Sequence, residues 1–215
     1  MGEEKTVLLS SSYFGPIQYF TKFLLFPDRI IEQFDHYGKQ TYRNRCRIYG
    51  ANGILTLSIP VLKGSEHKTL VKDIRIDYSR NWRKLHWKSM ESAYRHSPFF
   101  EFYMDDIRAL LDRKHTYLLD LNLEVLDRLL DALEIAGNYS LTQGFGGTGS
   151  GHFIDLREAI HPKVDPSEDQ YFRAEPYAQV FADRMGFKEN LSIIDLLFNA
   201  GPDAGMILEK CIPPR

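Results

Sequence analysis

The sequence predicts a mixed α/β protein: a mixed sheet with an N-terminal β-α-β unit and a β-hairpin, followed by a helical segment and a C-terminal α/β portion. Three observations predict this class. Residues 6–34 contain an apolar run, an amphipathic stretch and a second apolar run, the order found in a β-α-β unit. Asn52-Gly53 lies between alternating apolar residues, which is the strongest short-range hairpin signal. Leucines recur at intervals of three and four within residues 116–135, as expected of an amphipathic helix.

The β-α-β unit comprises a strand at 6–10, a helix at 17–26 and a strand at 29–34. In α/β sheets, ligands bind beyond the carboxyl ends of the strands. The loop after the first strand and the first turn of the helix meet at such an end. We therefore interpret Tyr13 and Gln18 as substrate-binding candidates, with burial in the core as the alternative.

Further elements follow from local patterns. Residues 71–77 alternate between apolar and polar side chains, which predicts a half-buried strand. Ser192 and Asp195 have the spacing of a capping box at the start of a helix, and this explains them better than nucleophile chemistry. The remaining predictions are hairpin strands at 46–49 and 53–60, helices at 79–97 (with Ser79 as N-cap), 99–113, 116–135, 190–199 and 203–210, a short strand at 139–142, and extended segments at 170–174 and 177–181.

The composition bounds the class of protein. The chain has 215 residues, of which 43% are hydrophobic, enough for one domain with a real core. The glycine-rich segment 143–151 is the only candidate for an internal boundary. The net charge of −2 gives no overall attraction to nucleic acid or to an anionic membrane. Cys46 and Cys211 fit two buried thiols rather than a disulfide framework.

The composition also bears on location. No apolar run approaches the roughly 20 residues that span a bilayer. The acidic first residues, followed by a stretch broken by polar side chains, do not form a signal peptide. We therefore expect a cytoplasmic protein with no membrane partner.

A basic-polar stretch carries the main functional prediction. Lys39, Tyr42, Arg43, Asn44 and Arg45 can bind anions, donate hydrogen bonds or stack. On an extended chain the two arginines point to one side and the asparagine to the other. Paired guanidinium groups suit phosphate or carboxylate, so we interpret all five residues as binding a small anionic ligand. The alternative is a solvated turn.

The glycine-rich segment 143–151 resembles a phosphate-binding loop. However, no Lys-Ser or Lys-Thr follows it, as a P-loop requires. A mobile loop lying over a site, or a disordered segment, is the better interpretation. His152 and Asp155 are three residues apart, but no third ligand accompanies them, so no metal site is predicted. The sequence indicates no particular cofactor.

His86 is the candidate general base, because histidine titrates near neutral pH. Tyr94 lies two helical turns further along the same face, and we assign it to the same pocket. The alternative is that both residues belong to the core.

Several blocks, in this order and spacing, resemble the WbqC-like protein family over nearly the whole chain. They are the stretch from Lys39 to Arg45 together with residues 13–20 (YFGPIQYF), 57–61 (LSIPV), 86–89 (HWKS), 93–94 (AY), 97–100 (SPFF), 191–199 (LSIIDLLFN) and 201–202 (GP). The sequence departs from the family pattern at Ser11-Ser12, where many members have Gln-Pro, near Pro16, where many have a tryptophan, and in the longer glycine-rich segment.

The resemblance implies a place in the synthesis of bacterial surface polysaccharide, including O-antigen. It implies transfer of an acyl, aminoacyl or glycyl group to an amino sugar or sugar nucleotide. The first hypothesis is therefore a transferase, in which Arg43 and Arg45 hold the anion and His86 takes a proton from the attacking group. The second is a non-catalytic sugar-nucleotide-binding protein of the same pathway. The third, binding of nucleic acid, is disfavoured by the charge of −2 and by the shortness of the basic run.

Overall fold

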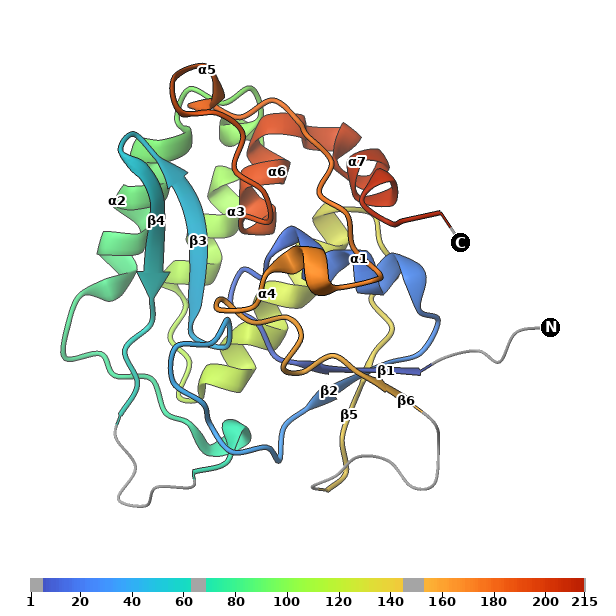
Figure 1. Ribbon diagram of the computed structural model, residues 1–215. Coiled ribbons are helices and arrows are strands. Elements are labelled where there is room, and N and C mark those ends of the chain that lie inside the picture. Colours follow the sequence, from blue (N-terminus) through green and yellow to red (C-terminus); the bar gives the residue numbers. More distant parts are fainter. Residues whose placement is uncertain (1–5, 63–68, 145–152, 215) are drawn as a thin grey trace.

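The computed structural model describes residues 6–62, 69–144 and 153–214. Its central feature is a sheet of strands in the order β5-β2-β1-β6, in which every neighbouring pair is parallel (Figure 1). Strand β1 (Thr6–Ser10), helix α1 (Ile17–Leu25) and strand β2 (Arg29–Glu32) form the predicted β-α-β unit. Valine, leucine and isoleucine fill these strands because a parallel sheet between covering layers is buried on both faces.

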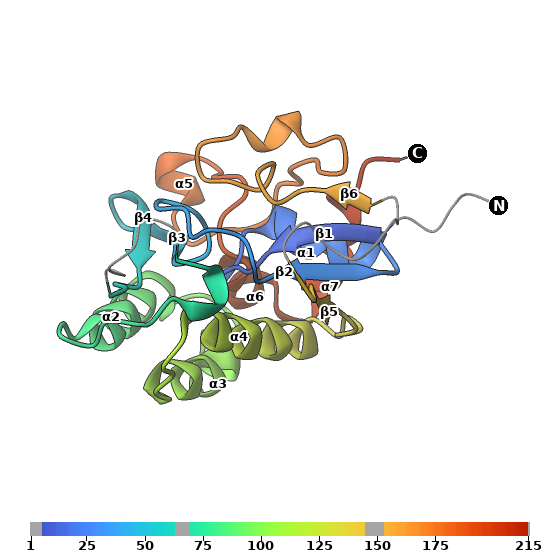
Figure 2. The ribbon, with the colours of Figure 1, turned by 90° about the horizontal axis from the view of Figure 1, so that it is seen from below.

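The sheet is completed from the second half of the chain. Strand β5 (Ser140–Leu141) pairs with β2, and strand β6 (Phe153–Asp155) pairs with β1. The short strand predicted at 139–142 is therefore confirmed. Figure 2 shows the segment after β6 on one side of the sheet and helices α3 and α4 on the other. This arrangement confirms the mixed α/β class.

The predicted hairpin is also confirmed, as a separate two-stranded antiparallel sheet. Strand β3 (Arg45–Gly50) pairs with β4 (Gly53–Ser58) from the Arg45–Ser58 pair to the Gly50–Gly53 pair. Gly53 has φ of +110°, a backbone conformation that glycine adopts without steric cost. The basic stretch therefore leads directly into the hairpin, because its last residue, Arg45, is the first residue of β3.

The helices lie close to their predicted ranges: α2 (Trp82–Tyr94), α3 (Phe100–Asp112), α4 (Leu118–Ala132), α6 (Ile193–Ala200) and α7 (Ala204–Lys210), with the short α5 at Ala182–Met185. The prediction of Ser79 as an N-cap is wrong. The Asn81 side chain accepts from the backbone N–H of Lys84 instead. In α4 the leucine stripe is buried, with Leu119, Leu126 and Leu130 at most 4% exposed.

The prediction of a strand at 71–77 is wrong. Residues 71–77 form a single 3₁₀ turn at Val71–Asp73 and isolated bridges rather than a strand. The alternation there records the burial of Val71, Ile74 and Ile76 without a neighbouring strand to pair with. The segments 170–174 and 177–181, predicted as strand-like or extended, form no strand.

The capping-box interpretation of α6 is also wrong. The Ser192 hydroxyl donates to the Phe14 carbonyl oxygen at 2.7 Å and makes no cap hydrogen bond. The Asp195 carboxylate accepts hydrogen bonds from other side chains rather than from the helix end. Tertiary contacts therefore define the position of α6 against α1 and β3.

One cluster of buried residues extends from Val7 to Cys211 and joins the β-α-β unit, the hairpin and the C-terminal helices. The glycine-rich segment 143–151, the candidate for an internal boundary, lies mostly outside the described residues, as does His152. Among the described residues, no helix combines the length and apolar character needed to cross a bilayer.

Candidate functional site: the carboxyl edge of the parallel sheet

The carboxyl ends of β1 and β6 meet in a small cavity. It is lined by Ser10, Ser11, Ser12, Tyr19, Thr41, Tyr42, Arg43, Leu156, Arg157, Ile160 and His161, and we call it the edge cavity. Its volume is about 10 Å³, the space of a single water molecule. The segment that carries Tyr42 and Arg43 is held over the edge because the Tyr42 carbonyl accepts from the Tyr13 backbone N–H at 2.9 Å. The structure therefore brings part of the basic stretch to the edge at which ligands of α/β proteins bind.

The Arg43 guanidinium is fixed in this edge. Its Nη2 donates to Ser10 Oγ at 2.7 Å and to Asp35 Oδ2 at 3.1 Å, and the side chain is 4% exposed. Burial lowers the pKa of Arg43, while the nearby Asp35 and Glu158 raise it. A guanidinium keeps its proton in such a setting. Arg43 is therefore a fixed positive charge.

A second cation, Arg157, comes from the end of β6. Its Nη2 lies 2.6 Å from Asp155 Oδ2 and its Nη1 lies 3.5 Å from Glu32 Oε2. These contacts raise the pKa of Arg157, chiefly through the hydrogen bonds to Asp155. Glu32 is itself fixed by the hydroxyl of Thr142 at 2.8 Å. The carboxylates orient Arg157 and offset part of its charge.

Three buried polar atoms in this lining have no hydrogen-bond partner among the described residues: Ser12 Oγ, Tyr19 OH and Arg43 Nε. A buried polar group without a partner costs about 1–3 kcal/mol. Two hydroxyls and a guanidinium N–H beside a cavity can all donate to a water or to an oxygen of a ligand. This excess of donors suits an anionic group.

His161 is the histidine of the edge cavity. Its Nδ1 accepts from the Lys163 backbone N–H at 3.1 Å, so the neutral ring carries its proton on Nε2. Burial lowers the pKa of His161; Glu158 opposes this shift, and the cations Lys163, Arg43 and Arg45 add to it. His161 is therefore a neutral donor near pH 7.

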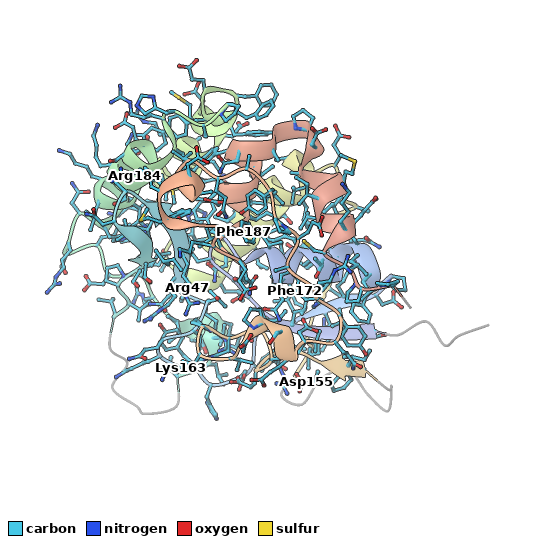
Figure 3. All side chains as sticks on the ribbon, turned by 45° about the horizontal axis from the view of Figure 1, so that its top comes forward. Arg47, Asp155, Lys163, Phe172, Arg184 and Phe187 are labelled. Carbon is cyan, nitrogen blue, oxygen red and sulfur yellow. The ribbon has the colours of Figure 1, made fainter. Side chains whose placement is uncertain are left out.

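A larger, open groove of about 400 Å³ lies next to the edge cavity and shares Tyr42 with it. We call it the outer groove; it is lined by Tyr42, Arg47, Ile54, Val164, Pro166, Phe187, Lys188, Glu189 and Asn190. The Arg47 guanidinium stacks 5.9 Å from the centre of the Tyr42 ring and donates to the Pro162 carbonyl. Figure 3 shows Arg47 and Phe187 close together on this face. Flat rings and cations together suit a nucleotide.

The rest of the basic stretch lies outside the edge cavity. Arg45 is half-buried, and its charge and that of Arg43 oppose the rise in the pKa of Tyr37, which burial brings to about 12. The Asn44 Nδ2 donates to the Ile59 carbonyl at 2.8 Å. Lys39 is exposed in the preceding turn. Of the five residues, Tyr42 and Arg43 line the edge cavity.

Tyr13 and His86 meet in the core instead. The Tyr13 hydroxyl donates to His86 Nδ1 at 2.9 Å, and His86 Nε2 donates to the Ser58 carbonyl at 3.2 Å. Both side chains are at most 1% exposed. Burial lowers the pKa of His86 to about 4, against a smaller opposing effect of the Ser58 hydrogen bond. A base poised near neutral pH needs a different environment.

Gln18 and Tyr94 belong to two further buried clusters. Gln18 donates to Asp169 Oδ2 at 2.8 Å, and the same carboxylate lies 2.6 Å from Lys22 Nζ. The Tyr94 hydroxyl donates to Asp195 Oδ1 at 2.7 Å. Neither Gln18 nor Tyr94 lines the edge cavity or the outer groove.

Sequence reasoning did not select Arg157, His161 or Tyr19. Ligands of α/β sheets bind beyond the carboxyl ends of the strands, and this rule applies to Arg157, which follows β6, as well as to the loop after the first strand. His161 had no local signal, because the chain folds back beside Arg43 without a motif. Cys46, interpreted as a buried thiol, is 1% exposed, and burial raises its pKa. Among the described residues, no three His, Cys, Asp or Glu side chains are grouped to hold a metal ion.

The parallel sheet and its polar carboxyl edge define an α/β protein with a candidate anion site. The chain belongs to the WbqC-like protein family, whose model matches residues 11–164. It is also similar to the uncharacterized protein Rv1507c of Mycobacterium tuberculosis (strain ATCC 25618 / H37Rv), with 26% identity over 233 residues, covering 97% of this chain and 99% of that protein. No solved structure matches the chain.

Proposed function

We propose that this protein binds a sugar nucleotide or a related small anionic precursor at the edge cavity and outer groove, and transfers an acyl or aminoacyl group to it. The family resemblance supports a role in bacterial surface polysaccharide, including O-antigen. The observation that carries the binding proposal is the group of buried, unpartnered donors beside Arg43 at the carboxyl edge of the sheet.

Each of the two cavities binds a chemically different part of the ligand. The edge cavity takes one anionic oxygen, which accepts from the Ser12 and Tyr19 hydroxyls and from the neutral His161 ring. Arg43 and Arg45 supply the positive field. The outer groove takes the flat part of the ligand, between Tyr42 and Phe187, with Arg47 and Lys188 beside its phosphates.

In the transfer step, the amine of an amino sugar attacks the carbonyl of an acyl donor. A new amide bond forms, the ester or thioester bond of the donor breaks, and the amine proton leaves with the released alcohol or thiol. The contribution of this site is to hold the acceptor in one orientation. His86 has no part in this proposal, since both of its ring nitrogens are hydrogen-bonded in the core.

The second candidate is a non-catalytic binding protein of the same pathway. It is favoured by His161, whose Nδ1 already accepts from the Lys163 N–H. In that tautomer the ring donates and cannot take a proton. The same cavities then serve recognition alone.

Thermal unfolding with UDP-N-acetylglucosamine tests the binding proposal. A ligand at about 100 times its Kd raises the Tm of a chain of this size by about 5–10 °C. We expect this rise in the wild type and in Arg80→Gln, whose arginine is exposed outside both cavities, and a smaller rise in Arg45→Gln. Equal shifts in the two variants contradict the proposal, and so does the absence of any shift across a panel of sugar nucleotides.

Turnover separates the two candidates. UDP-glucosamine, which carries the free amine that the transfer step requires, is incubated with the protein and with acyl-thioester and aminoacyl donors, and the mass of the nucleotide is followed. An increase by the mass of the acyl group supports the transferase. Ligand binding without any mass change across the donors supports the binding protein.

A further inference from the structure

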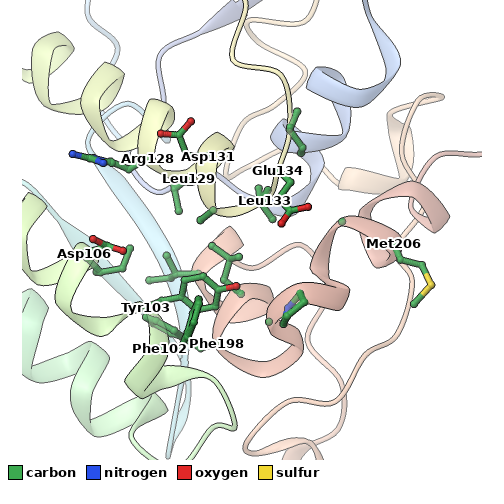
Figure 4. Close-up of a pocket in the computed structure, with 18 of the residues that line it drawn as sticks. Phe102, Tyr103, Asp106, Arg128, Leu129, Asp131, Leu133, Glu134, Phe198 and Met206 are labelled. Atoms are coloured by element: carbon green, nitrogen blue, oxygen red, sulfur yellow. The ribbon is translucent and has the colours of Figure 1, made fainter.

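A second hollow lies away from the edge cavity, between helices α3, α4, α6 and α7. Its volume is about 650 Å³, and we call it the helix groove. Figure 4 shows Asp106 on the α3 wall facing Arg128 and Asp131 on α4. None of its lining residues lines the edge cavity or the outer groove. A ligand or partner of the helix groove would therefore be a different molecule from the proposed sugar nucleotide.

The groove has an apolar floor and apolar edges. Leu129, Leu197 and Phe198 form part of the floor and are at most 1% exposed. On the edges, Phe102 is 74% exposed and Met206 is 51% exposed. A large aromatic ring and a flexible thioether held in solvent beside a hollow are typical of a surface that a partner covers.

The acidic residues of the rim come from three of the four helices or their ends. Asp106 lies on α3, Asp131 lies on α4 with Glu134 just beyond its end, and Glu209 lies on α7; Arg128 is the single cation in the lining. All four acidic residues are exposed. None of the four carboxylates forms an ion pair or a side-chain hydrogen bond with another described residue. The rim thus presents free negative charge around an apolar channel.

The dimensions fit a helix. The α3 wall extends from Phe102 to Leu110, which is about 12 Å at 1.5 Å per residue. Two or three turns of an amphipathic helix bury an apolar face over such a length. Lysine side chains lay their methylene stems on apolar edges while the ammonium groups reach outward, here towards the acidic rim.

We propose that the helix groove is a docking site for a basic amphipathic helix of a partner protein. Apolar side chains of that helix, at i, i+3, i+4 and i+7, enter between Phe102 and Met206. Its lysines or arginines pair with Asp106, Glu134 and Glu209. The charge complementarity selects a basic helix over an acidic one.

A synthetic peptide tests this proposal on the full chain. The probe is a fluorescein-labelled helix of about 18 residues, roughly 27 Å long, with leucine on one face and lysine on the other; a matched peptide has glutamate in place of lysine. We expect saturable binding of the lysine peptide in fluorescence anisotropy and at least about tenfold weaker binding of the glutamate peptide.

Variants in the rim locate the site. Asp106→Lys combined with Glu134→Lys, and separately Phe102→Ala, are expected to weaken lysine-peptide binding by about tenfold or more. Asp105→Lys is the matched control, because Asp105 is the exposed neighbour on α3 that does not line the groove. It is expected to change the affinity by less than about threefold. All of these side chains are exposed, and an unchanged Tm confirms folding.

Three outcomes overturn the proposal. The first is equal binding of the two peptides, and the second is an equal loss of affinity in Asp105→Lys and in the double variant Asp106→Lys with Glu134→Lys. The third is a dimer in sedimentation that Phe102→Ala dissociates, which assigns the groove to a second copy of this chain. The sugar-nucleotide shift in Tm is expected in all of these variants, so the two proposals fail separately.

Discussion

The edge cavity and the core clusters both bury polar side chains, but they differ in whether those side chains have partners. In the core, the Asp195 carboxylate accepts from Tyr94 at 2.7 Å, from Tyr177 at 2.6 Å and from Gln179 at 3.1 Å. At the edge cavity, Ser12 Oγ and Tyr19 OH have no partner among the described residues. Satisfied groups stabilise the fold, whereas unpartnered ones weaken it. Other buried atoms, such as Trp82 Nε1 and Asn44 Oδ1, also lack a partner in the described part of the chain. The edge cavity differs because its unpartnered groups belong to residues that line a cavity, where a ligand would restore the missing hydrogen bonds.

The same contrast explains why residue type alone misleads. His86 and His161 are both histidines with a lowered pKa. His86 is held by Tyr13 and Ser58 between α2 and β4, while His161 lines the cavity beside Arg43. The surroundings of each ring decide which one can meet a ligand.

The largest expected effect is the loss of the buried acceptor in the core. Asp195→Ala leaves the hydroxyls of Tyr94 and Tyr177 buried without their acceptor. We expect the free energy of unfolding to fall by about 3–5 kcal/mol, measured by urea denaturation. Asp203→Ala, which removes an exposed carboxylate, serves as control and is expected to cost less than about 0.5 kcal/mol. Equal losses in the two variants contradict the assigned role of Asp195.

The pH dependence of stability gives the next largest effect. The unfolded His86 ring binds its proton below about pH 6.5, whereas the pKa of the buried ring is about 4. Above about pH 6.5 the ring is neutral in both states, so His86 does not lower the free energy of unfolding. As the pH falls from 6.5 towards 4, only the unfolded state binds the proton, and the free energy of unfolding decreases. The full change is about 3 kcal/mol. Below about pH 6 Asp195 acts in the opposite direction, because burial raises its pKa to about 6.

His86→Gln isolates the histidine contribution, since Asp195 is common to both proteins. We expect the stability advantage of the wild type over His86→Gln to shrink by about 3 kcal/mol between pH 6.5 and pH 4, as followed by urea denaturation at each pH. Sugar-nucleotide binding by the folded variant at pH 7.5 is expected to be unchanged. A constant advantage across this range would mean that the ring keeps its ordinary pKa.

The sequence predicts the fold better than the site. The β-α-β unit and the hairpin are confirmed because each has a local signal, such as Asn52-Gly53. The prediction of a strand at 71–77 is wrong because alternating apolar residues indicate which side chains are buried. Whether a segment also pairs as a strand depends on neighbours that are distant in the sequence. At the edge cavity, Arg43 could be selected from the sequence because it lies in a local cluster of cations. Its neighbours Arg157 and His161 are more than 100 residues further along the chain, and a local sequence pattern cannot show that they lie beside Arg43.

The next prediction concerns the cation at the edge. Arg43→Lys keeps the positive charge but loses the Nε–H, which has no partner among the described residues, and shortens the side chain whose Nη2 reaches Ser10 and Asp35. We expect about tenfold weaker binding of the sugar nucleotide, measured by calorimetry. Arg80→Lys makes the same exchange outside both cavities and is expected to leave the affinity unchanged. Wild-type affinity in Arg43→Lys would show that the guanidinium geometry is irrelevant to the ligand.

The smallest expected effect compares the core with the edge cavity most directly, because one tyrosine in each place can lose its hydroxyl group. Tyr94→Phe removes a hydroxyl that donates to Asp195 and accepts from the Tyr49 N–H, so we expect a loss of about 1–3 kcal/mol. Tyr19→Phe removes a buried hydroxyl with no partner among the described residues. Its stability is expected to stay within about 0.5 kcal/mol of the wild type or to rise.

Ligand binding is expected to show the reverse order. Tyr19→Phe weakens sugar-nucleotide binding by about threefold, since the hydroxyl donates to the ligand and gains its partner only in the complex. Tyr94→Phe leaves the affinity unchanged in the fraction that is folded. Urea denaturation and calorimetry on the same two variants therefore separate a structural hydroxyl from a ligand-binding one. If Tyr19→Phe costs as much stability as Tyr94→Phe, its hydroxyl has a partner in the fold, and the excess of donors that defines the edge cavity is lost.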